Sequence, residues 1–117
     1  MASAAVFDSA LFMGIGRDAP GASVWRYDGN AVTLVKGGGL GDDWNVAASC
    51  MAECAGATYV GTQGNYHGSV YRYDGASAFT CVAEPGFGGR SDAYCMAEMG
   101  GRLYVGTGGP QDGAAVW

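Results

Sequence analysis

The side chains best suited to chemistry gather in three glycine-rich segments of this chain. Asp42-Asp43-Trp44-Asn45 offers two carboxylates and an indole, which could cradle a calcium ion or stack against a sugar ring. Tyr66-His67 could supply a general base or a metal ligand. The third segment contains Arg90 and Asp92. A plainer alternative stays open for each segment, because acidic loop residues are usually only solvated and a lone histidine usually has no such role.

The cysteines give little sign of chemistry of their own. Cys50, Cys54, Cys81 and Cys95 lie in apolar settings and form no C-x-x-C pair, which predicts buried free thiols. Cys50 and Cys54 cannot be bridged if they share a strand, because four residues of strand span about 13 Å. A bridge between Cys50 and Cys95 stays open. His67 is the only histidine, so we expect no zinc site, no other metal and no cofactor.

The charge balance limits the possible partners. Eleven acidic residues against six basic ones give a net charge of −5, and Lys36 is the only lysine. Such a surface repels phosphate backbones, so we expect no nucleic-acid partner. The first residues contain no basic segment and no apolar run approaches the length of a membrane span. We therefore expect a soluble, cytoplasmic protein without a membrane partner.

Three short sequence motifs, which we call words, recur along the chain at nearly the same spacing. Val24-Trp25-Arg26-Tyr27-Asp28-Gly29 returns as Val70-Tyr71-Arg72-Tyr73-Asp74-Gly75, a step of 46, and begins again at Val116-Trp117. Cys50-Met51-Ala52-Glu53 returns as Cys95-Met96-Ala97-Glu98, a step of 45. Tyr59-Val60-Gly61-Thr62 returns as Tyr104-Val105-Gly106-Thr107, and Phe12-Met13-Gly14 is an earlier copy. Such a period indicates a repeat architecture.

Each repeat is typical of a group of short strands. Its words are rich in β-forming residues and are bounded by glycine, of which the 117 residues include 22. No stretch keeps a helical period. We expect four strands per repeat and eleven in all, at about 4–8, 11–15, 23–28, 31–36, 48–54, 58–62, 69–74, 78–83, 93–98, 102–107 and 114–117. The fold class is therefore all-β.

Four-stranded repeats of this length are the signature of β-propeller blades. The words LYVGTGG at 103–109 and VWRYDG at 24–29 resemble those of kelch-type propellers, and also those of bacterial propeller repeats. The chain departs from the kelch pattern where the paired glycines become Gly-Thr or Gly-Ile. The resemblance implies one partial propeller domain over residues 1–117. Its antiparallel blades would span about 4–36, 48–83 and 93–117, with the last lacking its outermost strand.

The repeated side chains are expected to be structural. The set comprises Trp25, Arg26, Tyr27, Asp28, Tyr71, Arg72, Tyr73, Asp74, Glu53 and Glu98. Because the arginines recur in step with the glutamates, we expect an ion pair between neighbouring sheets. Asp28-Gly29 and Asp74-Gly75 are expected to form hairpin turns, where glycine tolerates a positive φ.

Fewer than three blades cannot close a ring, since propellers have about four to eight. An open arc would leave two apolar sheet faces in water. We therefore expect a homodimer that forms a six-bladed ring; a five-bladed ring is the alternative. A further alternative is that the chain is a truncated fragment of a larger kelch-like propeller.

The longer and more variable loops should lie on one side of the disc, where propellers usually carry function. The candidate residues there are Arg17, Asp18, Asp42, Asp43, Trp44, Asn45, Tyr66, His67, Arg90, Asp92 and Asp112. We expect a non-enzymatic binding or assembly module whose ligand is a glycan, a small molecule or a protein. An enzyme or a metal site on this side is the alternative. Kelch-type oxidases use copper with several histidines, which His67 alone cannot supply.

Overall fold

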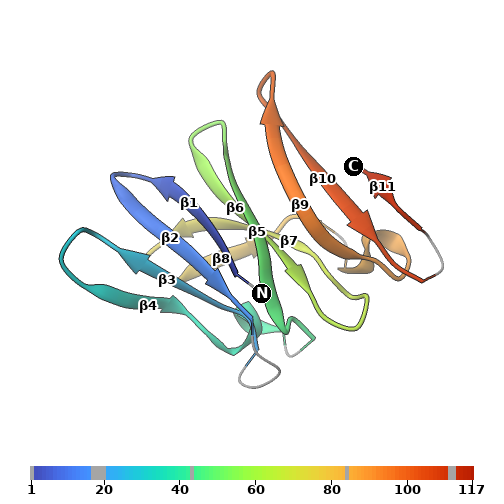
Figure 1. Cartoon of the computed structure of the whole chain (residues 1–117), viewed down its shortest axis with the longest axis horizontal. Coiled ribbons are helices and arrows are strands. Elements are labelled where there is room, and N and C mark those ends of the chain that lie inside the picture. The colour runs from blue at the N-terminus through green and yellow to red at the C-terminus, as the bar shows by residue number, and fades with distance from the viewer. Residues whose placement is uncertain (1, 17–20, 43, 84, 111–112) are drawn as a thin grey trace.

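The chain folds into three antiparallel sheets, each a simple meander (Figure 1). A computed structural model describes residues 2–16, 21–42, 44–83, 85–110 and 113–117, and within these ranges it contains eleven strands. Sheet 1 consists of β1 (Ala2–Phe7), β2 (Ala10–Ile15), β3 (Ser23–Tyr27) and β4 (Val32–Lys36). Sheet 2 consists of β5 (Ala47–Cys54), β6 (Ala57–Gln63), β7 (Val70–Gly75) and β8 (Ala78–Cys81). Sheet 3 consists of β9 (Asp92–Met99), β10 (Arg102–Gly108) and β11 (Ala115–Val116).

The strand predictions are confirmed. Every described strand lies within two residues of its expected bounds, and no α-helix occurs among the described residues. The same part of the chain contains no helix that is long and apolar enough to cross a membrane. Repeated words adopt the same register, since Cys50 pairs with Gly61 in sheet 2 and Cys95 pairs with Gly106 in sheet 3. The repeats are therefore repeats of structure as well as of sequence.

The turn after β3 follows from its sequence. The Asp28 carboxylate accepts hydrogen bonds from the backbone N–H groups of Asn30 and Ala31, and Gly29 takes a φ of 95°. This is the side-chain capping that aspartate brings to turns, with glycine in the conformation that other residues avoid. Gly75 likewise has a φ of 101°, at an irregularity where β7 meets β8. The two predicted hairpin turns are thus confirmed.

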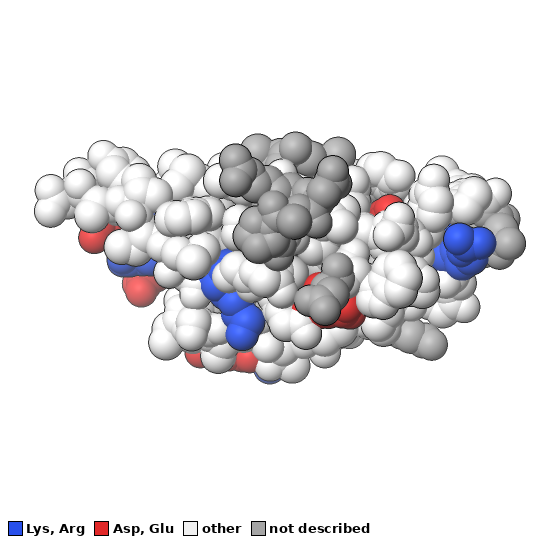
Figure 2. Space-filling view, turned by 90° about the horizontal axis from the view of Figure 1, so that it is seen from below, with Lys and Arg blue, Asp and Glu red and all other residues white. Residues whose placement is uncertain are grey.

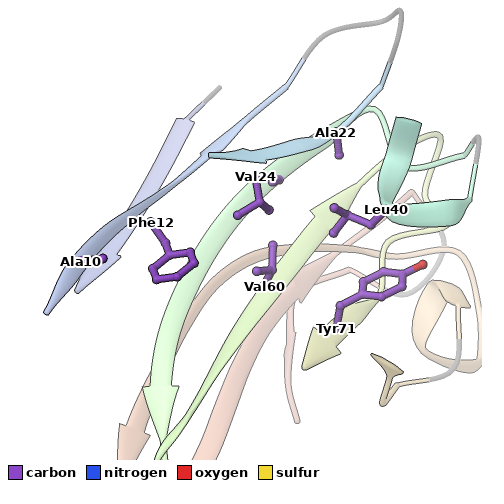
Figure 3. Packing of buried hydrophobic residues seen from close by; sticks show 8 residues of the cluster. Ala10, Phe12, Ala22, Val24, Leu40, Val60 and Tyr71 are labelled. Atoms are coloured by element: carbon purple, nitrogen blue, oxygen red, sulfur yellow. The ribbon is translucent and has the colours of Figure 1, made fainter. Parts of the chain in front are cut away.

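The three sheets are arranged in chain order around their first strands. β1 lies beside β5, and β5 lies beside β9, so sheet 2 is packed between sheets 1 and 3 (Figure 1). Two apolar clusters fill the gaps. Cluster 1 joins sheets 1 and 2 and includes Phe12, Val24, Val60 and Tyr71, as Figure 3 shows. Cluster 2 joins sheets 2 and 3 and includes Cys50, Val70, Ala93 and Val105.

The connections between sheets carry a repeat that the sequence analysis did not identify. Short 3₁₀ turns span Gly38–Gly41 and Pro85–Gly88. Leu40 and Phe87 occupy the same place in these turns, with φ values of 59° and 54°. Left-handed conformations are costly for such residues, roughly 1 kcal/mol each. Burial offsets the cost, because Leu40 belongs to cluster 1 and Phe87 packs against cluster 2.

The outer faces of sheets 1 and 3 are apolar and uncovered. On sheet 1, strand alternation places Met13, Trp25 and Leu34 on the side opposite cluster 1, and Leu34 is 53% exposed. On sheet 3, Tyr94 and Met99 are 49% and 67% exposed. Water therefore reaches sheet faces that closely resemble those buried around sheet 2.

The cysteine expectation is half right. All four cysteines are free thiols, but only Cys50 and Cys54 are buried, whereas Cys81 and Cys95 are exposed. Cys81 lies on β8, at the outer edge of sheet 2, and Cys95 lies on the outer face of sheet 3. Apolar neighbours in sequence predicted burial, but burial also requires an opposing sheet.

Candidate binding site

The longer loops meet on one side of the molecule, as the sequence predicted. Ala22 N–H donates to the carbonyl of Asn45, and Gly68 N–H donates to the carbonyl of Ser91, with N–O distances of 2.8 and 3.1 Å. These bonds join a loop within one sheet to the connection leading to the next. Figure 2 views this side, where the charged side chains of the described residues lie at separate places. Backbone hydrogen bonds thus join the described parts of the loops of neighbouring sheets on this side.

Trp44 and His67 come together on this surface from different segments. Their ring centroids are 4.9 Å apart, with an angle of 36° between the ring planes. The Asp42 carboxylate accepts a hydrogen bond from the Trp44 backbone N–H at 3.0 Å, which fixes the turn that presents the indole. Trp44 remains 53% exposed. The structure therefore places one indole where a ligand could touch it.

Asn45 lies beneath this surface. It is fully buried, and its side-chain amide donates to the Gly39 carbonyl and to the Tyr71 hydroxyl, both at 2.9 Å. Its carbonyl oxygen accepts a hydrogen bond from the Thr62 hydroxyl. These bonds satisfy the amide within the protein. Asn45 therefore holds the loop on β6 and β7 and is not positioned to touch a ligand.

The Asp92 carboxylate likewise hydrogen-bonds within the protein and stabilises a loop. It is 6% exposed, and one carboxylate oxygen accepts the backbone N–H groups of Gly64 and Gly68 at 3.0 Å. These residues flank Tyr66 and His67, so the carboxylate fixes the loop that carries them. Tyr66 is 37% exposed with a φ of 62°, and His67 forms a β-bridge with Ser91.

Of the remaining loop candidates, the structure describes only Arg90. Arg90 lies exposed in the connection before β9. Arg17, Asp18, Asp43 and Asp112 lie outside the described residues. Within the described part, no three histidine, cysteine, aspartate or glutamate side chains are grouped closely enough to hold a metal ion.

A hollow of about 580 Å³ opens beside Trp44, and we call it the Trp44 hollow. Its lining includes Leu40, Asp42, Trp44, Tyr71, Phe79 and Cys81. The loop supplies one wall, and β7 and β8 supply the other. Burial raises the pKa of Tyr71, and the nearby Asp42 carboxylate adds to the effect, so the phenol stays protonated at neutral pH.

Sequence reasoning missed the strand side of this hollow. The sequence assigns Tyr71 a scaffold role and Cys81 the role of a buried free thiol, and Phe79 is not among its candidate site residues. The available signal was the repeated Gly-Leu-Gly and Gly-Phe-Gly, at 39–41 and 86–88, which marks where each connection folds back over a sheet. Its partner residues come from distant strands, so only the fold reveals them.

The repeated arginines pair differently from the expectation. Arg72 Nε lies 2.8 Å from Asp74 Oδ1, and Arg26 Nη1 lies 3.8 Å from Asp28 Oδ2. Among the described residues, the ion pairs include neither Glu53 nor Glu98, and the Glu98 carboxylate instead accepts the Gly101 N–H. The expected pairing between sheets is therefore wrong. Residues two apart in a strand share a face, which makes Arg-x-Asp a pair within one strand.

Hydrogen bonds lower the pKa of both aspartates in these pairs, so each carboxylate stays ionised to a lower pH. The backbone N–H groups of Ala31 and Asn30 lower the pKa of the Asp28 carboxyl. The Thr80 hydroxyl and the Arg72 guanidinium lower the pKa of Asp74. Both carboxylates are well exposed, so the pairs contribute little to stability and act mainly to order the hairpin ends.

Comparison with known proteins adds no further constraint, because no protein-family model and no curated protein matches this chain.

Proposed function

We propose that this chain is a kelch-like β-propeller module of just under three blades, and that two copies associate into a six-bladed ring. The module is non-enzymatic in this proposal and uses its loop side for binding. We call the uncovered outer faces of sheets 1 and 3 the end faces. The observation that carries the proposal is that their side chains occupy the same repeat positions as the side chains buried on the two faces of sheet 2.

The repeats show which buried face each end face resembles. Tyr104 and Cys95 on the outer face of sheet 3 correspond to Tyr59 and Cys50, which pack between sheets 2 and 3. Met13 and Trp25 on the outer face of sheet 1 correspond to Val60 and Tyr71, which pack between sheets 1 and 2. Sheet 3 of one copy can therefore pack on sheet 1 of another as sheets pack within the chain.

Such head-to-tail contacts close only when the rotation between copies allows it. Two chains related by a two-fold axis along the ring would form two identical contacts and leave no end face uncovered. Burial of the apolar side chains on both faces would drive the association. A binding role is supported by the use of Asn45 and Asp92, whose polar groups serve to hold loops in place.

The test is the mass in solution, measured by light scattering over a range of concentrations. We expect twice the 11.9 kDa chain mass, and we expect Met13→Asp on the sheet 1 end face to reduce it to one chain. Thr33→Asp, at an exposed polar position, is the matched control and should leave the mass unchanged. A wild-type monomer at every concentration would refute self-association, and a mass that grows without limit would refute ring closure.

A further inference from the structure

The Trp44 hollow combines aromatic walls with one acidic group. Trp44, Tyr71 and Phe79 line it together with the Asp42 carboxylate. Among the described residues, Trp44 contacts the His67 ring and Phe79 contacts the Tyr73 ring. Three aromatic rings thus line one hollow together with a carboxylate, and aromatic ring faces are groups by which proteins hold organic cations.

We propose that the Trp44 hollow binds a small organic ammonium ion, with the cation against the aromatic rings and near Asp42. The inference deepens the binding role proposed above. It does not depend on ring closure, because every lining residue belongs to sheet 2 or to the connections before and after it within one chain.

Electrostatics favours a cation over other small ligands. Asp42 is the one charged residue among the described lining residues, and Tyr71 is kept protonated by burial. The net charge of −5 adds a long-range attraction for cations and repels anions. A weakly hydrated alkylammonium also gains from contact with Leu40 and Phe79, whereas a sugar would need more hydrogen-bonding groups than this lining offers.

The corresponding space between sheets 2 and 3 offers a natural contrast. It has a volume of about 330 Å³ and is lined by Val70, Phe87, Val105 and Trp117, among others. Phe87 and Trp117 occupy the positions of Leu40 and Tyr71, but no charged residue lines this space in the described part of the chain. We expect it not to select for a cation.

The experiment titrates the protein with choline and with 3,3-dimethylbutan-1-ol, its uncharged isostere, and follows binding by calorimetry and NMR. We expect choline to bind at least about tenfold more tightly than the isostere, since the two differ only in charge. Trp44→Leu should weaken choline binding by about tenfold. Asp42→Asn should weaken it several-fold while keeping an oxygen that can accept the Trp44 N–H.

The controls separate this inference from folding and from assembly. Trp117→Leu alters the uncharged counterpart and should leave choline binding unchanged, and circular dichroism checks that each variant is folded. Equal binding of choline and its isostere, preference for methyl glucoside, or no binding at high choline concentration would each refute the ammonium site. None of these outcomes affects the mass measurement, so the ring proposal is judged separately.

Discussion

Sheets 2 and 3 contain the same sequence words in different surroundings. Cys50 is 7% exposed because sheet 3 covers it, whereas Cys95, at the same register position, is exposed. Tyr71 is 6% exposed under sheet 1 and Leu40, whereas the equivalent Trp117 faces sheet 2 but follows the two-residue edge strand β11 and is 59% exposed. The first two strands nevertheless pair in the same register in both sheets. The comparison shows that local sequence determines where a strand forms, whereas the surrounding structure determines whether its side chains are buried.

The end face of sheet 1 completes the comparison. Val60 is fully buried in cluster 1, but Met13, its counterpart one repeat earlier, is only half-buried on an uncovered face. Equivalent substitutions in the two environments should therefore differ in cost. If a second copy covers the end faces, the difference in unfolding free energy between the two substitutions should shrink as the protein concentration rises.

The largest effect is expected from placing a charge in the covered position. Val60→Asp buries a carboxylate without a partner, and we expect it to lower the free energy of unfolding by more than about 4 kcal/mol, enough to prevent folding. Met13→Asp should cost less than about 1 kcal/mol at concentrations below those of association, because its carboxylate can reach water. Urea denaturation followed by tryptophan fluorescence measures both. Equal losses of unfolding free energy would show that the outer face of sheet 1 is covered as fully as the face of sheet 2 that contains Val60.

A smaller difference is expected at the glycines opposite the two cysteines. A Cβ on Gly61 would lie 2.4 Å from Cys50 Sγ and 3.0 Å from Ala93 Cβ, so the added methyl has no room to escape. On Gly106 it would meet Cys95 Sγ at 2.5 Å, but that thiol is free to turn into solvent. We expect Gly61→Ala to destabilise the fold by about 1–3 kcal/mol.

Gly106→Ala is the matched control for that overpacking. It should lower the free energy of unfolding by less than about 1 kcal/mol in the dilute protein. Thermal or urea unfolding of the two variants measures the difference directly. A Gly106→Ala variant as unstable as Gly61→Ala would mean that the face of sheet 3 is already covered in the single chain.

The fold could be predicted from sequence wherever the determinants are local. Strand positions followed from alternation and glycine, and the turn at Asp28-Gly29 followed from known side-chain capping. The ion pair of Arg72 was predicted wrongly, because recurrence in step with Glu98 was given more weight than the two-residue periodicity of a strand.

The candidate site was less predictable because its determinants are distant in sequence. Asn45 appeared to be one more polar loop residue, yet its amide reaches Tyr71, 26 residues away. The left-handed turn at Leu40 is strained locally and is stabilised by cluster 1, so no local propensity indicates it. The residue types of Asp42 and Trp44 suggest a ligand role from sequence, but the hollow that both residues line is seen only in the fold.

Thiol reactivity gives the finest test of the comparison between sheets. Burial raises the pKa of Cys50 to about 11, and because the thiolate is the reactive form, alkylation of Cys50 should stay slow until the pH approaches that value. Cys95 should react quickly in dilute protein at pH 8, since no sheet covers it. Raising the protein concentration should slow Cys95 if a second copy packs on that face. Cys81 is exposed but lies off the end faces, so its rate should be independent of concentration.

The sign of the pH effect on stability follows from the same thiol. A folded-state pKa above the ordinary value of 9.0 means that the folded protein favours the neutral thiol, so this contribution is complete below pH 9 and is lost as the pH rises through 11. Replacing Cys50 with alanine should flatten that part of the stability profile, whereas replacing Cys95 with alanine should not in dilute protein.

Site-resolved mass spectrometry after iodoacetamide treatment measures the alkylation rates of the cysteines. Equal modification of Cys50 and Cys95 at pH 8 would contradict the difference in covering, because two thiols in one sequence word can differ in rate here only through what lies opposite them.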